Sequence, residues 1–303
     1  MGDTSVSNFH SEEKLDNEFK EIEKLKKALE ESQDKLEESK IKTEFIANLS
    51  HEFKTPLNIL MGAMQLIEMY ALNGSIIDTD KKLEKYMDTM KQNALRLLKL
   101  INNIIDITKI YSSELSLEFH NYDVVSIVKN VVQSIAVYAK LKSVNIHFKT
   151  ELNERIIACD ADKIERIMLN LLSNALKFTD GGGSIVVSIN SYDNKVHISV
   201  EDNGIGIHED KLKIIFKRFR QVDKSFTRNR EGSGIGLSIV KGLVEMHNGS
   251  IRVESQYKKG SRFTIELPET VLDETSQAGL YELYEDRVRE RVRVELSDIE
   301  DIC

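Results

Sequence analysis

The sequence predicts a multidomain chain: an all-α helical hairpin that forms a dimeric four-helix bundle, followed by an α+β domain. Three observations predict this fold class. Apolar residues in the first third recur at helical spacing, segments of helical and of alternating period follow one another in the second half, and two glycine clusters interrupt that half. A length of 303 residues suffices for two domains.

Composition restricts the partners and the compartment. A formal net charge of −8 argues against broad affinity for nucleic acid or for an anionic membrane surface. Cys159 and Cys303 lie far apart with no metal spacing, which indicates neither a disulfide framework nor a zinc site and favours a reducing, cytoplasmic setting. No apolar run approaches the roughly 20 residues that span a bilayer, so we expect no membrane span in this chain. A sensor or membrane partner outside this chain and an input from the cytosol both stay open as alternatives.

Residues 1–40 carry a seven-residue apolar repeat that predicts a coiled-coil helix. The repeat consists of Leu15, Ile22, Leu29 and Leu36. Its second apolar series is weak, because polar residues occupy most of those places, and a solvated single helix with favourable charge pairs stays open as an alternative.

Residues 41–112 read as two helices with a break near 72–78. Apolar residues of the second helix alternate steps of three and four: Leu83, Met87, Met90, Ala94, Leu97, Ile101 and Ile104. One hairpin buries only one stripe on each helix, so we expect two copies to pair as a homodimer.

The segment "SHEFKTP" places His51 on the side of the first helix that faces away from its apolar stripe. Glu52 can reach the ring and stabilise the tautomer whose other nitrogen is free to attack, and Thr55 shares the exposed face. Pro56 removes the amide that would bond the Glu52 carbonyl and should loosen and bend the helix there. The alternative is a surface histidine beside a tolerated proline.

After a linker at 113–120, residues 121–268 read as an α+β domain. Helical patterns cover 121–140 and 160–178, and period-two patterns cover 184–189, 195–201, 249–255 and 261–268. The tail at 269–303 is highly charged, and its segment "RVRERVRVELSDI" fits helix and strand templates equally.

Polar residues in this domain suggest a nucleotide pocket. Asn170, Asn174 and Lys177 form one stripe on a helix, where amide oxygens suit hydrated Mg²⁺ and the lysine suits a phosphate, although paired asparagines are more often solvated or capping residues. Asp202 shares a strand face with apolar residues and needs a donor, for which the exocyclic amine of adenine is a candidate. Gly204 and Gly206 would let the backbone approach the base.

The second glycine cluster, Gly232, Ser233, Gly234, Ile235 and Gly236, precedes a helix whose first amides are available to phosphate. Alone it is weak evidence, since it has neither Rossmann nor P-loop context. Phe216, Phe219 and a basic stretch that includes Arg220 separate the two clusters, and either a mobile lid over a triphosphate or a solvated basic loop explains them.

Together these motifs resemble the two-component sensor histidine kinases over residues 41–268. The matching segments, in family order, are "FIANLSHEFKTPL", "NLLSNALKFT", "DNGIGI", "FKRF" and "GSGIGL". The resemblance implies ATP-dependent phosphorylation of His51 and phosphoryl transfer to an aspartate on a response-regulator receiver domain. It also implies a Bergerat-type ATP-binding domain arranged as an α/β sandwich, and it makes the 1–40 helix a signalling helix.

The resemblance also assigns roles to individual residues. Glu52 would assist as a base, Thr55 would serve a phosphatase activity toward the regulator, Asn170 and Asn174 would bind Mg²⁺, and Asp202 would hold adenine. The glycine boxes, which end at Ile207 and Leu237, and the lid with Phe219 and Arg220 would line the nucleotide.

Two other functions compete with this interpretation. A different ATPase of the same superfamily could act as an ATP-driven dimer clamp, but such clamps lack a histidine box on a dimerising hairpin. A catalytically silent dimeric scaffold would be expected to have damaged glycine boxes, and these look intact. The 269–303 tail lies beyond the family pattern.

Overall fold

The computed structural model describes residues 46–70, 82–112, 114–217, 234–273 and 285–299, together with scattered positions between 24 and 43. The chain divides into two compact units, residues 1–48 and 49–303. Within the first unit the described positions are helical, and Leu29 and Leu36 of the predicted repeat are exposed. Leu15, Ile22 and the predicted break at 72–78 lie outside the described residues.

Residues 46–70 and α2 (Lys82–Tyr111) form the two predicted helices of the hairpin. The first helix continues without a break through Pro56. The rings of Tyr70 and Tyr86, 6.2 Å apart, join the end of the first helix to the start of α2. Much of the predicted apolar stripe remains in solvent within one chain, since Met87 is 59% and Ile101 is 45% exposed.

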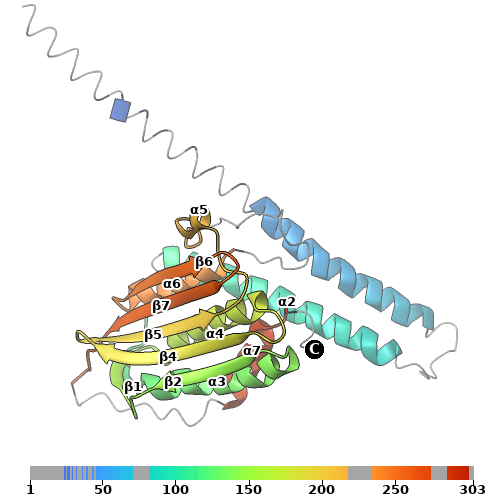
Figure 1. Ribbon diagram of the computed structural model, residues 1–303. Coiled ribbons are helices and arrows are strands. Elements are labelled where there is room, and N and C mark those ends of the chain that lie inside the picture. Colours follow the sequence, from blue (N-terminus) through green and yellow to red (C-terminus); the bar gives the residue numbers. More distant parts are fainter. Residues whose placement is uncertain are drawn as a thin grey trace, which may run out of the picture. The chain divides into compact units, whose positions relative to one another are not determined.

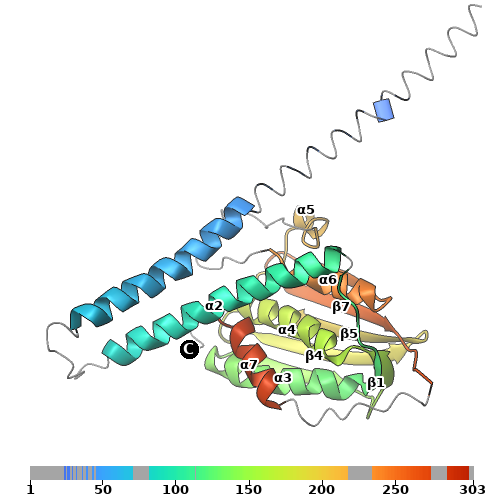
Figure 2. The ribbon, with the colours of Figure 1, turned by 180° about the vertical axis from the view of Figure 1, so that it is seen from behind.

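The α+β domain has a five-stranded mixed sheet covered on one face by helices (Figures 1 and 2). The sheet order is β2-β4-β5-β7-β6, in which β2 and β4 are parallel and the other neighbours are antiparallel. Its strands are β2 (Asn145–Thr150), β4 (Ser184–Tyr192), β5 (Lys195–Asp202), β6 (Ser250–Gln256) and β7 (Gly260–Pro268). The helices are α3 (Val124–Leu141), α4 (Ala161–Phe178), α5 (Glu209–Leu212) and α6 (Gly236–Met246).

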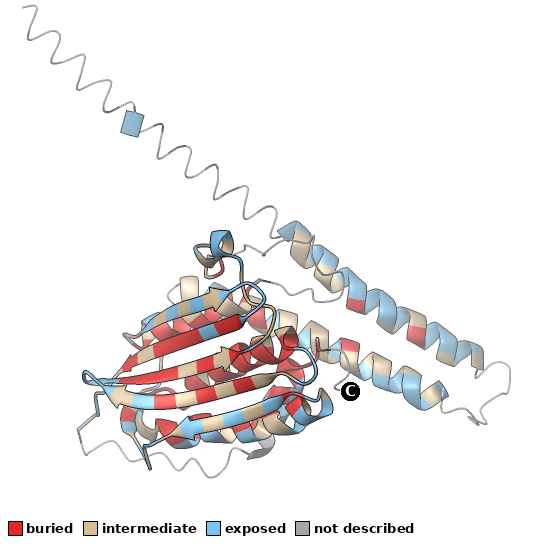
Figure 3. Ribbon diagram, in the orientation of Figure 1, coloured by how far each residue is buried: buried red, intermediate tan, exposed pale blue. Residues whose placement is uncertain are grey.

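The core lies between the sheet and the helices α3, α4 and α6 (Figure 3). The alternation predicted for the central strand is confirmed, because Val196, Ile198 and Val200 of β5 are all buried. Helix α4 is buried beyond its predicted stripe. Its other faces pack against α3 and α6, and Leu169, Leu172 and Leu176 are fully buried.

Three short strands escaped prediction: β2, β1 (His120–Asp123) and β3 (Ile156–Cys159). β1 and β3 form a separate two-stranded antiparallel sheet. Four residues are too few to show a period, and β1 contains only polar residues and a tyrosine. The predicted helix at 121–140 begins only at Val124, because the Asp123 side chain caps its first turn by accepting from the amides of Val125 and Ser126.

The two ends of this domain are fastened to each other. The Asn121 side chain donates to the Leu272 carbonyl at 2.9 Å and accepts from the Leu272 amide at 2.8 Å. The amide of Ala158 donates to the Thr270 carbonyl at 2.7 Å. Segments near the start of this domain and after its last strand, β7, are therefore hydrogen-bonded to each other.

The charged tail contains one described helix, which resolves the ambiguity of the sequence in favour of a helix over 287–295. Helix α7 (Glu285–Glu295) contacts α2, α3 and α4. Val288, Val292 and Glu295 are buried at steps of four and three, as on the packed face of a helix, and Val294 near its end is buried as well.

In the described part of the chain, α3 alone is long and apolar enough to cross a membrane. The helix packs against α4 and β2, and Val128, Val131 and Ile135 are fully buried there. These contacts are those of a core helix.

We expect Ile198→Ala to lower the stability of the α+β domain by about 2–5 kcal/mol, because it leaves a cavity beneath the central strand. Asn190→Ala, at an exposed position of β4, is the matched control and should change stability little. Differential scanning calorimetry would measure both. Equal shifts for the two variants would contradict this assignment of the core.

Candidate functional site

The polar stripe of α4 meets the start of α6. The Asn170 side chain is buried, and its Nδ2 donates to the Arg166 carbonyl at 3.0 Å. A Cβ added to Gly236 would lie 2.6 Å from Asn170 Oδ1. The second glycine cluster therefore packs against α4 at a distance that only glycine permits.

The first turn of α6 suits an anion. Gly234 has a φ of +66°, and the buried Ile235 precedes the helix without supplying a side-chain cap. Its first turn carries no acidic residue, and Leu237 is half-buried. Uncapped amides at a helix N-terminus attract phosphate. Phe219, Arg220, Gly232 and Ser233 of the predicted site lie outside the described residues.

Asp202 ends β5 opposite Ser261 of β7 and is only 8% exposed. Its Oδ1 accepts from the Gly204 amide at 2.9 Å. Burial raises the pKa of Asp202, while hydrogen bonds from the backbone of Gly204 and Ser261 act in the opposite direction and the charge of Glu201 adds to the rise. The carboxylate is therefore buried with two backbone donors, and burial outweighs their effect on its pKa.

The first glycine box is shaped by close contacts with protein backbone. A Cβ on Gly204 would lie 2.2 Å from the Phe178 carbonyl, and one on Gly206, whose φ is +65°, would lie 2.1 Å from the Gln256 carbonyl. The Ile207 amide donates to Ser255 Oγ at 2.7 Å. These contacts join the box to the end of α4 and to the turn between β6 and β7.

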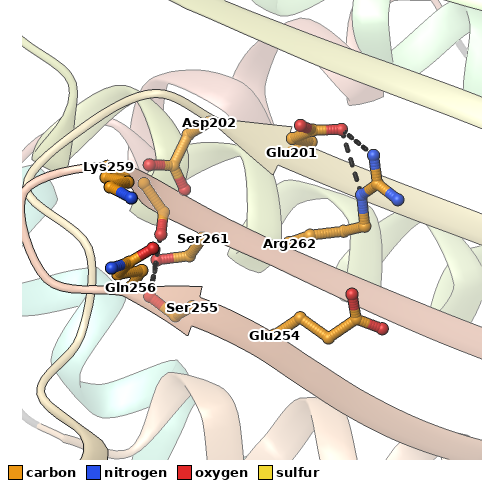
Figure 4. Close-up of a pocket in the computed structure, with 9 residues that line it drawn as sticks. Glu201, Asp202, Glu254, Ser255, Gln256, Lys259, Ser261 and Arg262 are labelled. Atoms are coloured by element: carbon orange, nitrogen blue, oxygen red, sulfur yellow. Dashed lines mark hydrogen bonds and ion pairs between the residues drawn. The ribbon is translucent and has the colours of Figure 1, made fainter.

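Sequence reasoning missed that turn. A Cβ on Gly260, whose φ is +113°, would lie 1.9 Å from the Asp202 carbonyl oxygen. The turn helps to form a pocket of about 270 Å³ (Figure 4), lined by Glu201, Asp202, Glu254, Ser255, Gln256, Lys259, Gly260, Ser261 and Arg262. The glycine of "YKKGS" was the available signal. This pocket holds Asp202 but no residue of α4.

Lys177, the third member of the α4 stripe, is buried and 6% exposed. Its Nζ lies 2.8 Å from Asp298 Oδ2 in the C-terminal segment. Asn174, one turn before Lys177, is half-buried. Lys142 positions this end of α4, because its Nζ donates to the carbonyls of Leu176 at 2.7 Å and Thr179 at 3.0 Å.

On the hairpin, His51 and Thr55 are exposed one helical turn apart, and Glu52 is half-buried beside them. The Thr55 hydroxyl donates to the His51 carbonyl at 3.2 Å. The helix thus presents an imidazole, a carboxylate and a hydroxyl within one turn.

Two family models match the chain. The His Kinase A (phospho-acceptor) domain matches residues 41–112, and the ATPase family described as histidine kinase-, DNA gyrase B- and HSP90-like matches residues 159–271. The chain belongs to the histidine kinases. The resemblance stated from the sequence, including its fold class, is thereby confirmed.

Curated histidine kinases align with most of this chain. It is 35% identical over 82% of its length to hybrid signal transduction histidine kinase D of Dictyostelium discoideum. It is 32% identical over 77% of its length to the circadian input-output histidine kinase CikA of Synechococcus elongatus. The chain spans only 16% and 31% of those two proteins.

Solved histidine kinases share the fold. ThkA in complex with the response regulator TrrA aligns with a TM-score of 0.57 and 25% identity, over 74% of this chain and 61% of that one. Full-length ShkA in complex with AMPPNP aligns with a TM-score of 0.56 and 26% identity, over 75% and 46%.

Asp202→Asn should separate binding from stability. The side-chain amide of the substituted asparagine can present a donor to the adenine amine, which is itself a donor. We therefore expect the binding free energy of ATP to weaken by about 1–3 kcal/mol. The nucleotide-free domain should become more stable at neutral pH. The pKa of Asp202 in the folded protein lies above the ordinary value of about 3.9. The stability that protonated Asp202 contributes to the wild type is therefore fully present below about pH 3.9 and is lost as the pH rises through the folded pKa.

Thermal unfolding across pH, with ATP titrations at pH 7, measures both effects. Glu254→Gln is the matched control, since it neutralises a well-exposed carboxylate that lines the same pocket. Unchanged ATP affinity in Asp202→Asn, or a gain in stability that does not grow as the pH rises above about 4, would contradict the assignment.

Proposed function

We propose that this chain is an ATP-dependent protein histidine kinase that phosphorylates itself on His51 and passes the phosphoryl group to an aspartate of a response-regulator receiver domain. One observation supports this most: an exposed His51 within a phospho-acceptor domain, in the same chain as an ATPase domain of the histidine kinase type. A clamp ATPase or a silent scaffold accounts for only part of that combination.

The proposed reaction is attack by an imidazole nitrogen of His51 on the γ-phosphorus of ATP. The bond from that phosphorus to the bridging oxygen of ADP breaks as the bond to nitrogen forms. Glu52 fixes the ring tautomer and takes the ring proton. The exposure of His51 lets a nucleotide and then a receiver aspartate reach the same nitrogen.

Different parts of the ATP molecule are assigned to different elements. We assign the adenine amine to Asp202 and the phosphates to the N-terminus of α6, to Lys177 and to the lid with Phe219 and Arg220. Among the described residues no cluster of three His, Cys, Asp or Glu side chains offers a metal site. The amide oxygens of Asn170 and Asn174 are ligands suited to Mg²⁺, which would neutralise phosphate charge.

The proposed assembly is a homodimer. Exposed apolar side chains on both helices of the hairpin, including Leu57, Met64 and Met87, need cover that one chain does not give. A second hairpin would provide it by completing a four-helix bundle. The complex of ThkA with TrrA, in which a related kinase holds a response regulator, supports the assignment of the second partner.

The proposed division of the chain follows from these roles. A coiled-coil signalling helix occupies 1–40, the phosphotransfer hairpin 41–112, a linker 113–120, the ATP-binding domain 121–268 and the charged tail 269–303. We place the chain in the cytoplasm, where ATP is available and thiols stay reduced.

His51→Gln should abolish labelling by γ-labelled ATP and leave nucleotide affinity nearly unchanged, because the nucleotide contacts we assign lie on another domain. The wild-type label should be lost in acid and survive alkali, as a phosphoramidate does. His147→Gln, which alters an exposed histidine of β2, is the control and should keep full labelling. An acid-stable label, or label retained by His51→Gln, would reject His51 as acceptor.

Thr55→Ala should keep autophosphorylation within several-fold and strongly slow dephosphorylation of the cognate regulator, because only hydrolysis of the aspartyl phosphate needs a positioned water. Thr55→Ser retains the hydroxyl and should keep both activities. The two rates would be followed with phosphorylated regulator and with labelled ATP. If both activities fell together in Thr55→Ala, the hydroxyl would serve only the helix, through its hydrogen bond to the His51 carbonyl.

A further inference from the structure

The C-terminal segment 285–299 is bound to the rest of the protein by an apolar face. Val292, Leu296 and Ile299 are almost fully buried. Helix α7 contacts α2 of the hairpin and α3 and α4 of the ATP-binding domain. The segment begins 14 residues after the ATPase family match ends at residue 271, and the family fold therefore does not account for it.

Charges on the segment match charges on its binding surface. Arg291 pairs with Asp162 at 3.0 Å and Glu165 at 3.3 Å. Glu295, which is buried, pairs with Arg166 at 2.7 Å and Lys99 at 3.3 Å. These opposite charges, one helical turn apart in the C-terminal half of α7, fix its register on α4 and α2.

Asp298 makes the contact that bears on function. Its Oδ1 lies 2.7 Å from Lys99 Nζ, and its Oδ2 lies 2.8 Å from Lys177 Nζ. Burial acts to raise the pKa of Asp298, but the ammonium groups of Lys99 and Lys177 outweigh burial and hold that pKa well below its usual range. The carboxylate stays ionised and bridges two lysines.

A bridging carboxylate and a phosphate offer a lysine the same chemistry. Both present negatively charged oxygens to an ammonium group that donates three hydrogen bonds. Lys177 is nearly buried, so its charge requires an anionic partner. In the proposed function the anionic partner of Lys177 is a phosphate of ATP, whereas in this structure it is the carboxylate of Asp298.

We propose that Asp298 is an internal ligand of Lys177 and that the C-terminal segment competes with the phosphates of ATP for this lysine. This inference rests on the phosphate role proposed for Lys177. The segment also bonds to α2, because Arg96 Nε donates to the Ser297 carbonyl at 2.7 Å and Lys99 pairs with Asp298. A nucleotide phosphate that binds Lys177 in place of Asp298 therefore also weakens the attachment of the C-terminal segment to the hairpin.

The test compares binding of AMPPNP and of adenosine to the full chain by calorimetry. Asp298→Asn should raise AMPPNP affinity by about threefold to tenfold, because the lysine is no longer occupied by a carboxylate. Adenosine, which has no phosphates, should bind as it does to the wild type. Glu290→Gln is the matched control, since it removes the same charge from an exposed position of α7, and it should change neither affinity.

Unchanged or weaker AMPPNP binding by Asp298→Asn, or an equal gain for adenosine, overturns the proposal. Adding Lys177→Met to Asp298→Asn separates this failure from failure of the proposed function. If that second substitution leaves AMPPNP affinity unaltered, the phosphate role of Lys177 is wrong. If it weakens binding while Asp298→Asn alone has no effect, only the competition is wrong.

Hydrogen exchange on the wild-type chain provides a second measurement that needs no variant. Saturating AMPPNP should speed exchange of the amides in 288–299, because the nucleotide displaces Asp298 from Lys177. Adenosine should not. Slower or unchanged exchange in this segment with AMPPNP contradicts the competition.

Discussion

Helix α4 is buried on almost every side, so a polar side chain on its buried faces needs a partner inside the protein. Arg166 bonds to Asp106 and Asn103 of α2 and to Glu295 of α7. Asn170 bonds to backbone of its own helix, and Lys177 bonds to Asp298. Because a buried polar group without a partner costs free energy, these bonds join the hairpin and the C-terminal segment to this one helix.

The same constraint explains how the site around Asp202 is built. Gly204, Gly206 and Gly260 bring three backbone segments together more closely than any side chain allows. Asp202 is largely removed from water there, and the Gly204 amide donates to its carboxylate. A group that donates to a buried carboxylate stabilises its charge, whereas an acceptor does not.

Long, regular elements could be predicted from the sequence because their period shows within one segment. The α4 stripe through Ile164 and Leu171 and the alternation through Ile198 are examples. β1 and β3 are too short to show a period, and Asp123 moved the start of α3 by a cap that depends on local geometry. Motifs likewise identified Asn170 and Asp202 as candidates. Local pattern could not connect Asp202 to Gly260 and Ser261, or Lys177 to Asp298, because these neighbours come from distant segments.

The hydrogen bonds between Asn121 and Leu272 hold the beginning and the end of the ATP-binding domain side by side. A domain closed in this way can be joined to new sequence before or after it without disturbing the sheet. The two curated relatives compared above carry the shared region within much longer chains. A domain whose two ends meet tolerates fusion at either end, so gene fusion can combine the same domain with many different input and output domains.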